Sequence, residues 1–200
     1  MTTANKVTVL RILLVPFFVV QVLYYERTGE EGHRLAAVLC FAIAAIADGY
    51  DGYLARRYNQ RSELGALLDP LADKLLLVSA LVLLTFDRRP YLPNLPLWLA
   101  GTVIGRDAVQ AIGFAVLHYT LGKVPIRPRL IGKVATVLQM VTVSWALLKW
   151  PTDWLGHLSA AAAVCTGISG VVYVMDGMRL AGASPDSAPL PGDAPEKPSP

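Results

Sequence analysis

Long apolar blocks, rather than alternating apolar and polar positions, dominate the hydrophobic pattern of this chain. Each block is long enough to cross about 30 Å of hydrocarbon as an α-helix. Six transmembrane helices are predicted in this way, over residues 7–25, 33–58, 64–86, 96–120, 130–150 and 154–178. The pattern therefore predicts an all-α integral membrane protein.

The second and third blocks differ from the others because each is polar over part of its length. The second is apolar from Leu35 to Ala47 and then turns polar, whereas the third begins polar and becomes apolar after Lys74. Consecutive spanning helices run in opposite directions, so these two polar halves meet at the same face of the membrane. That face is the natural place for a polar site.

The charges of the connecting segments predict which face this is. Lys and Arg gather after the second, fourth and sixth helices, while the other connections carry a weaker, mixed set of charges. Connections rich in Lys and Arg stay in the cytoplasm. We therefore expect both termini and the polar halves of the second and third helices on the cytoplasmic side.

Composition separates a membrane domain from a tail. The chain is 54% hydrophobic and 16% charged, whereas soluble domains average about 25% charged residues. The net charge of +3 is too small to predict a nucleic-acid partner. Residues 181–200 are rich in proline and poor in large apolar side chains, so we expect a disordered tail after a membrane domain at residues 1–180.

Four aspartates occupy the polar halves of the second and third helices. They are Asp48, Asp51, Asp69 and Asp73. The helical period places each pair on one face of its helix, because the spacings are three and four residues. Three small residues share these faces and permit close approach, namely Gly52, Ala55 and Gly65.

Such a cluster is costly unless it binds cations. Each aspartate at the middle of a bilayer costs about 2.5–3.5 kcal/mol, and converging carboxylates also repel one another. Carboxylate oxygens suit Mg²⁺, Mn²⁺ or Ca²⁺ rather than zinc. Four carboxylates from two helices can hold two ions about 4 Å apart, an arrangement used for displacement at phosphorus. We therefore predict a metal site at the cytoplasmic ends of these helices.

The aspartate cluster is also compatible with a purely structural role or with ion transport. The acids could only form ion pairs with neighbouring cations, which are Arg56, Arg57, Arg61 and Lys74. Alternatively, a cation transporter could use them as its ion site. A transporter predicts acids distributed along a path through the bilayer, whereas these four gather at one face, which favours an enzyme at the membrane surface.

The same residues resemble a known family signature. The pattern Asp48-x₂-Asp51-Gly52-x₂-Ala55-Arg56-x₈-Gly65-x₃-Asp69-x₃-Asp73 is similar to that of the CDP-alcohol phosphotransferases. The resemblance implies an integral membrane enzyme, usually a homodimer, here in a bacterial cytoplasmic membrane. Such an enzyme transfers a substituted phosphate from a CDP-linked donor to an alcohol and releases CMP.

The resemblance also implies roles for individual residues. Asp48, Asp51 and Asp69 would bind Mg²⁺ or Mn²⁺, and Asp73 would lie near a second ion and act as the general base. The CDP-linked donor would be bound by Asp48, Gly52, Ala55, Arg56 and Gly65. Asn5 and Thr8 match bacterial relatives that use CDP-diacylglycerol as the donor.

Two further segments bear on the acceptor. Arg106-Asp107 and the Lys133 segment, Gly132-Lys133-x₂-Thr136-x₂-Gln139, resemble enzymes that use glycerol-3-phosphate or phosphatidylglycerol. The Arg-Asp pair and a basic, proline-containing linker favour phosphatidylglycerol narrowly, as in eukaryotic-type cardiolipin synthases. Either acceptor carries a phosphate, for which the candidate ligands are Arg106, Lys133, Arg127 and Arg129. Attraction to the membrane surface explains Arg127 and Arg129 equally well.

Overall fold

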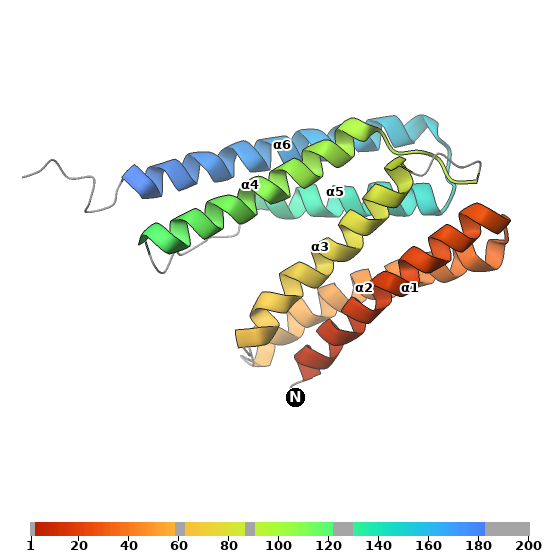
Figure 1. Cartoon of the computed structure of the whole chain (residues 1–200), viewed down its shortest axis with the longest axis horizontal. Helices are drawn as coiled ribbons and strands as arrows, with labels where there is room; N and C mark the ends of the chain where they lie inside the picture. The colour runs from red at the N-terminus through yellow and green to blue at the C-terminus, as the bar shows by residue number, and fades with distance from the viewer. Residues whose placement is uncertain (1–2, 59–62, 87–90, 122–129, 183–200) are drawn as a thin grey trace, which may run out of the picture.

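The computed structural model describes four stretches of the chain, residues 3–58, 63–86, 91–121 and 130–182 (Figure 1). Side chains are described for residues 11–47, 74–86, 91–116, 119 and 130–179. Six helices make up these stretches: α1 (Thr3–Thr28), α2 (Glu31–Tyr58), α3 (Glu63–Phe86), α4 (Leu97–Leu121), α5 (Leu130–Leu147) and α6 (Asp153–Gly182). The six predicted helices are confirmed, and every predicted boundary lies within four residues of the observed one.

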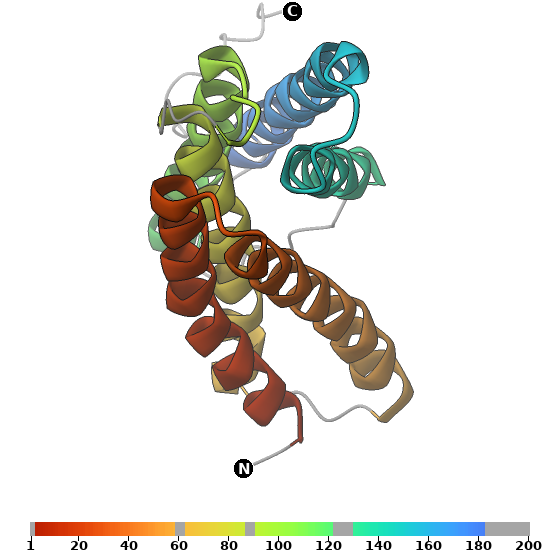
Figure 2. The same cartoon turned by 90° about the vertical axis from the view of Figure 1, so that its right-hand side faces the viewer.

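The helices form two groups of three that α3 joins. In one group α1 packs against α2 and α3, and in the other α6 packs against α4 and α5. Because α3 also contacts α4 and α5, it belongs to both groups. Figure 2 shows α2 diverging from α1 toward its C-terminal end.

The polar halves of α2 and α3 lie at the same end of the molecule, as predicted. Figure 1 shows the C-terminal end of α2, the beginning of α3 and the start of α1 at one end of the molecule, and Figure 2 shows the two ends of α2 and α3 apart from each other at that end. The α1–α2 and α5–α6 connections lie at the opposite end. Since only residues 59–62 separate α2 from α3, the two helix ends are within about 18 Å of each other.

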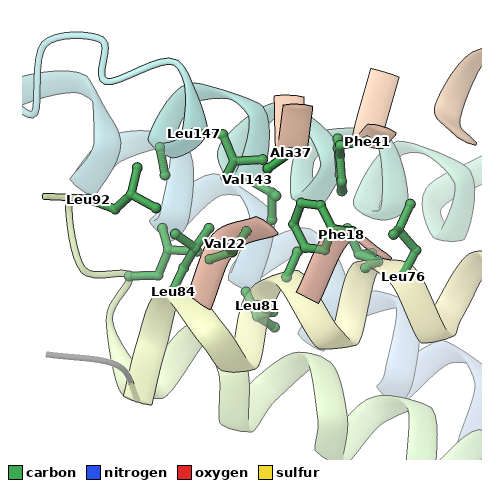
Figure 3. Close-up of a cluster of buried hydrophobic side chains, with 14 of the residues drawn as sticks. Phe18, Val22, Ala37, Phe41, Leu76, Leu81, Leu84, Leu92, Val143 and Leu147 are labelled. Atoms are coloured by element: carbon green, nitrogen blue, oxygen red, sulfur yellow. The ribbon is translucent and has the colours of Figure 1, made fainter. Parts of the chain in front are cut away.

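The apolar core is one cluster with residues from all six helices, and Figure 3 shows the part of it around α1, α2, α3 and α5. Phe18 of α1 and Phe41 of α2 face each other there, with ring centroids 5.9 Å apart. Leu81 of α3 and Val143 of α5 are also fully buried. This packing fixes α2 and α3 against a common partner directly beyond their aspartate-bearing halves.

A polar cluster connects α1, α2 and α5 at the end of the molecule opposite the aspartate-bearing halves of α2 and α3. Glu31 accepts hydrogen bonds from Arg34, from Tyr25 at 3.2 Å and from Lys149 at 3.4 Å. Arg34 also donates to the Leu147 carbonyl at 3.2 Å. The hydrogen bond from Arg34 is the main cause that lowers the pKa of Glu31. Hydrogen bonding with Tyr25, followed by that with Glu31, raises the pKa of Lys149.

Gly29 ends α1 in a conformation that other residues rarely adopt. Its φ is +70°, and its N–H donates to the Tyr25 carbonyl at 2.8 Å. A Cβ at this position would lie 2.7 Å from Cζ of Tyr91. Both the positive φ and this close approach therefore require glycine.

Three helices in the described stretches are long and apolar enough to cross a membrane. These segments are Leu97–Val116, Leu130–Leu147 and Asp153–Arg179, and Lys74–Phe86 forms a shorter apolar stretch. Large apolar side chains such as Ile112 and Val171 are more than half exposed on the outside, as expected of surfaces that face lipid. That all six helices span the membrane stays a prediction. Helix α6 runs to Gly182, and the rest of the predicted tail lies outside the described residues.

Candidate active site

The aspartates of α2 continue the buried face of that helix. Phe41 and Ala44 are 4% and 1% exposed and pack into the core. Asp48 follows Phe41 by seven residues, and Asp51 follows Ala44 by seven. Because α2 is helical through Tyr58 and seven residues make about two turns, these positions lie on the inward face of α2.

The aspartates of α3 continue a buried face in the same way. Leu76 and Ala80 are 4% and 0% exposed. Asp69 precedes Leu76 by seven residues, and Asp73 precedes Ala80 by seven. The backbone of α3 is helical from Glu63, so these positions share the face that packs into the core. All four positions therefore continue the buried sides of their helices at one end of the molecule.

The individual side chains predicted for the metal and the donor lie outside the described side chains. They are Asn5, Thr8, Asp48, Asp51, Gly52, Ala55, Arg56, Gly65, Asp69 and Asp73. Their roles stay predictions. Arg127 and Arg129 lie outside the described residues altogether. The chemistry of the set suits a hard divalent cation, because four carboxylates supply the oxygen ligands that Mg²⁺ and Mn²⁺ prefer.

A described ion-pair network adjoins this region in the middle of the helices. Oδ1 of Asp107 accepts a hydrogen bond from Arg106 Nη1 at 2.8 Å and one from Lys74 Nζ at 3.0 Å. Arg106 Nη2 donates to Oγ of Ser169 at 3.1 Å. The network thereby links α3, α4 and α6, and Lys74 directly follows Asp73 in the chain.

Two glycines allow the backbones of α5 and α6 to approach Arg106. A Cβ on Gly132 would lie 3.3 Å from both Arg106 Nη2 and Ser169 Oγ, and a Cβ on Gly170 would lie 3.3 Å from Arg106 Cγ. The beginning of α5 is therefore beside the guanidinium. Lys133 is the next residue and is exposed, so the two predicted acceptor ligands belong to one region.

The charge of this network suits an anion. Lys74 and Arg106 share one carboxylate, so the three groups together carry one net positive charge. Nε of Arg106 is buried and has no hydrogen-bond partner among the described residues. The guanidinium therefore keeps a donor beyond the bonds it makes to Asp107 and Ser169.

The rest of the predicted acceptor segment holds helices together. Gln139 Nε2 donates to Thr166 Oγ1 at 2.7 Å, and Thr166 Oγ1 donates to the Ala162 carbonyl at 2.6 Å. Thr136 Oγ1 donates to the Gly132 carbonyl at 3.1 Å, within its own helix. Within this segment, Gly132 and Lys133 are therefore the residues placed beside Arg106, and Gln139 joins α5 to α6.

Comparison with known proteins identifies the family. Residues 1–172 match the family model for CDP-alcohol phosphatidyltransferase. The chain belongs to this family. The CDP-diacylglycerol–glycerol-3-phosphate 3-phosphatidyltransferases of Shigella flexneri serotype 5b (strain 8401) and Escherichia coli (strain K12) are each 37% identical to it over 175 residues. These alignments cover 84% of this chain and 90% of each relative.

Membership of the CDP-alcohol phosphatidyltransferases confirms the resemblance in the signature and makes this chain a phosphatidyl-transferring enzyme rather than a transporter. The structure adds Lys74 and Ser169, which the sequence pattern did not assign to the site. Lys74 was a possible ion-pair partner of the aspartates, but the structure pairs it with Asp107. The sequence did indicate that Lys74 has a partner, because a charged side chain inside an apolar helix needs one.

Proposed function

We propose that this chain transfers the phosphatidyl group of CDP-diacylglycerol to glycerol-3-phosphate and releases CMP, a step in the synthesis of anionic phospholipids. The main support comes from the names of the two relatives, which state this donor and this acceptor. Each relative is 37% identical to this chain over 90% of its own length. These names favour glycerol-3-phosphate, the alternative acceptor in the sequence analysis, over phosphatidylglycerol.

The metal ions in this proposal are held by the four aspartates. Asp48, Asp51, Asp69 and Asp73 supply only carboxylate oxygens, which fits two Mg²⁺ or Mn²⁺ ions. When bound, such ions neutralise the negative charge of the diphosphate and polarise its phosphorus–oxygen bonds. The inward faces of α2 and α3, on which these positions lie, support the assignment.

The donor and the proton are handled by residues of the same two helices. Arg56 holds the diphosphate, and Gly52, Ala55 and Gly65 leave room for the nucleotide beside the backbone. Asn5 and Thr8 at the start of α1 complete the donor pocket. Asp73 takes the proton from the acceptor hydroxyl as the new bond to the phosphatidyl phosphorus forms and the bond to CMP breaks.

The acceptor phosphate is bound by cations on the neighbouring helices. Arg106 and Lys133 lie in one region, where Arg106 and Lys74 share the single carboxylate of Asp107. A dianionic phosphate provides the additional negative charge that this region favours. Arg127 and Arg129 belong to the same proposal, either on the acceptor phosphate or on the anionic membrane surface.

The location follows from the apolar helices and from the bacterial relatives. We propose an integral protein of the bacterial cytoplasmic membrane, with the active site open to the cytoplasm and the acyl chains of the donor in the lipid. The homodimer implied by the family resemblance is part of the same proposal. Apolar side chains on the outer faces of α4 and α6 support the lipid environment.

One assay tests the acceptor. Purified protein with labelled CDP-diacylglycerol is offered glycerol-3-phosphate, phosphatidylglycerol, inositol phosphate and serine in parallel, and the lipid product is identified by mass spectrometry. We expect phosphatidylglycerophosphate together with CMP. Cardiolipin as the main product would overturn the acceptor assignment while leaving the donor assignment intact.

Lys133→Ala tests the acceptor ligand separately. Loss of an exposed cation beside Arg106 should raise the KM for glycerol-3-phosphate more than the KM for CDP-diacylglycerol. An equal rise in both KM values would contradict a role for Lys133 in binding the acceptor.

A further inference from the structure

A carboxylate inside an apolar helix needs a reason to be there. Asp107 lies within Leu97–Val116, a segment long and apolar enough to span a membrane. Its side chain is 20% exposed, and the side chain of its neighbour Arg106 is 13% exposed. Charged groups at such positions are costly and usually serve a function. Neither the family signature nor the proposed mechanism gives Asp107 a role.

The contacts of Asp107 connect the two halves of the proposed site. Its Oδ1 accepts a hydrogen bond from Nζ of Lys74, on α3, at 3.0 Å. The same oxygen accepts one from Nη1 of Arg106, on α4, at 2.8 Å. Lys74 follows the proposed base Asp73 directly. Arg106 lies beside Gly132, where α5 begins and the exposed Lys133 follows.

Arg106 is held from two sides. Asp107 binds Nη1, and Ser169 of α6 accepts a hydrogen bond from Nη2 at 3.1 Å. Gly170 brings the α6 backbone against the aliphatic part of the side chain, since a Cβ there would lie 3.3 Å from Arg106 Cγ. A planar guanidinium fixed at both terminal nitrogens has a defined orientation.

We propose that Asp107 is a positioning residue for acceptor binding. Its carboxylate fixes the guanidinium of Arg106 in the orientation in which the guanidinium binds the acceptor phosphate. Through Lys74 it also sets the position of α3 relative to α4. This inference rests on the proposed function, because it requires an acceptor that carries a phosphate.

Asp107→Asn in the full-length protein tests the proposal, because the amide keeps the shape but removes the charge that holds both cations. We expect the KM for glycerol-3-phosphate to rise about tenfold and the KM for CDP-diacylglycerol to stay within about twofold. Asp107→Glu keeps the charge, so the KM should return to within about threefold of the wild-type value. An unchanged or lower KM for glycerol-3-phosphate in Asp107→Asn overturns the proposal.

A matched control separates positioning from general loss of an ion pair. Glu31→Gln removes a carboxylate that also binds two cations, Arg34 and Lys149, at the opposite end of the molecule. It should lower the melting temperature without changing the KM for either substrate. If Asp107→Asn behaved in the same way, Asp107 would be a structural tie only, and the inference would be wrong.

Ser169→Ala provides a second test if Asp107→Asn does not accumulate in the membrane. It removes the other anchor of Arg106, so the KM for glycerol-3-phosphate should rise in the same direction but by less. No change in that KM would contradict the positioning of Arg106. The wild-type acceptor assay separates this failure from failure of the proposed function. If the wild type used a neutral acceptor such as serine, both the proposed acceptor and this inference would be wrong.

Discussion

Replacing Gly132 by alanine should separate stability from activity. Gly132 is the third residue of α5, and an added Cβ would lie 3.3 Å from both Arg106 Nη2 and Ser169 Oγ. These two atoms are hydrogen-bonded to each other at 3.1 Å. A contact of 3.3 Å is tight, so the hydrogen-bonded pair must shift by a few tenths of an ångström.

Two terms of opposite effect determine the outcome. Alanine is more favourable than glycine within a helix by about 0.5–1 kcal/mol, which stabilises α5. A hydrogen bond to a charged group contributes about 1.5–3 kcal/mol, and we take the displacement of Arg106 to forfeit about 1 kcal/mol of it. If that loss appears in acceptor binding, the KM for glycerol-3-phosphate rises about fivefold. In the free energy of unfolding the gain and the loss nearly cancel, so the melting temperature should change little.

Steady-state kinetics and thermal unfolding of the Gly132→Ala protein measure the two terms. The matched control is Gly156→Ala, in the first turn of α6, where no atom lies within 4 Å of an added Cβ. The control should gain the same helix stability without a change in KM. Gly132→Ala kinetics equal to wild type would refute the idea that the geometry of Arg106 matters for the acceptor.

Four further results are expected. Asp73→Asn should abolish CMP release while the protein stays folded by circular dichroism, and EDTA should stop turnover until Mg²⁺ or Mn²⁺ is added; turnover in either case contradicts the proposed site. Gly29→Ala should lower the melting temperature, because left-handed backbone costs about 1–2 kcal/mol without glycine and the added Cβ meets Tyr91; an unchanged melting temperature would refute this. Because Arg34 lowers the pKa of Glu31, the stabilisation from Glu31 is present above the ordinary glutamate pKa of about 4.3 and is lost as the pH falls through the lowered pKa. Glu31→Gln should flatten this acid loss in a pH series of melting curves, and a curve parallel to wild type would count against it.

The helices could be predicted because each apolar block is long enough to cross the hydrocarbon of a membrane as a helix. The positions of the aspartates could be predicted for a related reason. The buried residues Phe41 and Ala44 set the inward face of α2, and continuing by seven residues leads to Asp48 and Asp51. Helical periodicity is a local property, so it can be read along one segment without knowledge of its partners.

The partners of Arg106 could not be predicted by the same means. Ser169 lies 63 positions further along the chain, and Lys74 lies on a different helix from Arg106. Periodicity gives the face of each helix but not which helix covers it. The resemblance assigned Gly132 and Gln139 to one acceptor segment, yet the structure places Gly132 beside Arg106 and hydrogen-bonds Gln139 to Thr166.

The same network explains why the Arg-Asp pair is a weak guide to the acceptor. The narrow preference for phosphatidylglycerol drew on the resemblance of the Arg-Asp pair to eukaryotic-type cardiolipin synthases, because the resemblance to phosphatidylglycerophosphate synthases implies glutamate at position 107. In the structure this carboxylate is turned toward Arg106 and Lys74. A glutamate adds one methylene but keeps the charge and both possible partners. Its effect on a distant part of the acceptor is therefore indirect. Glycerol-3-phosphate and phosphatidylglycerol both carry a phosphate and differ in the rest of the molecule. The residues that contact the rest of the acceptor must therefore distinguish the two.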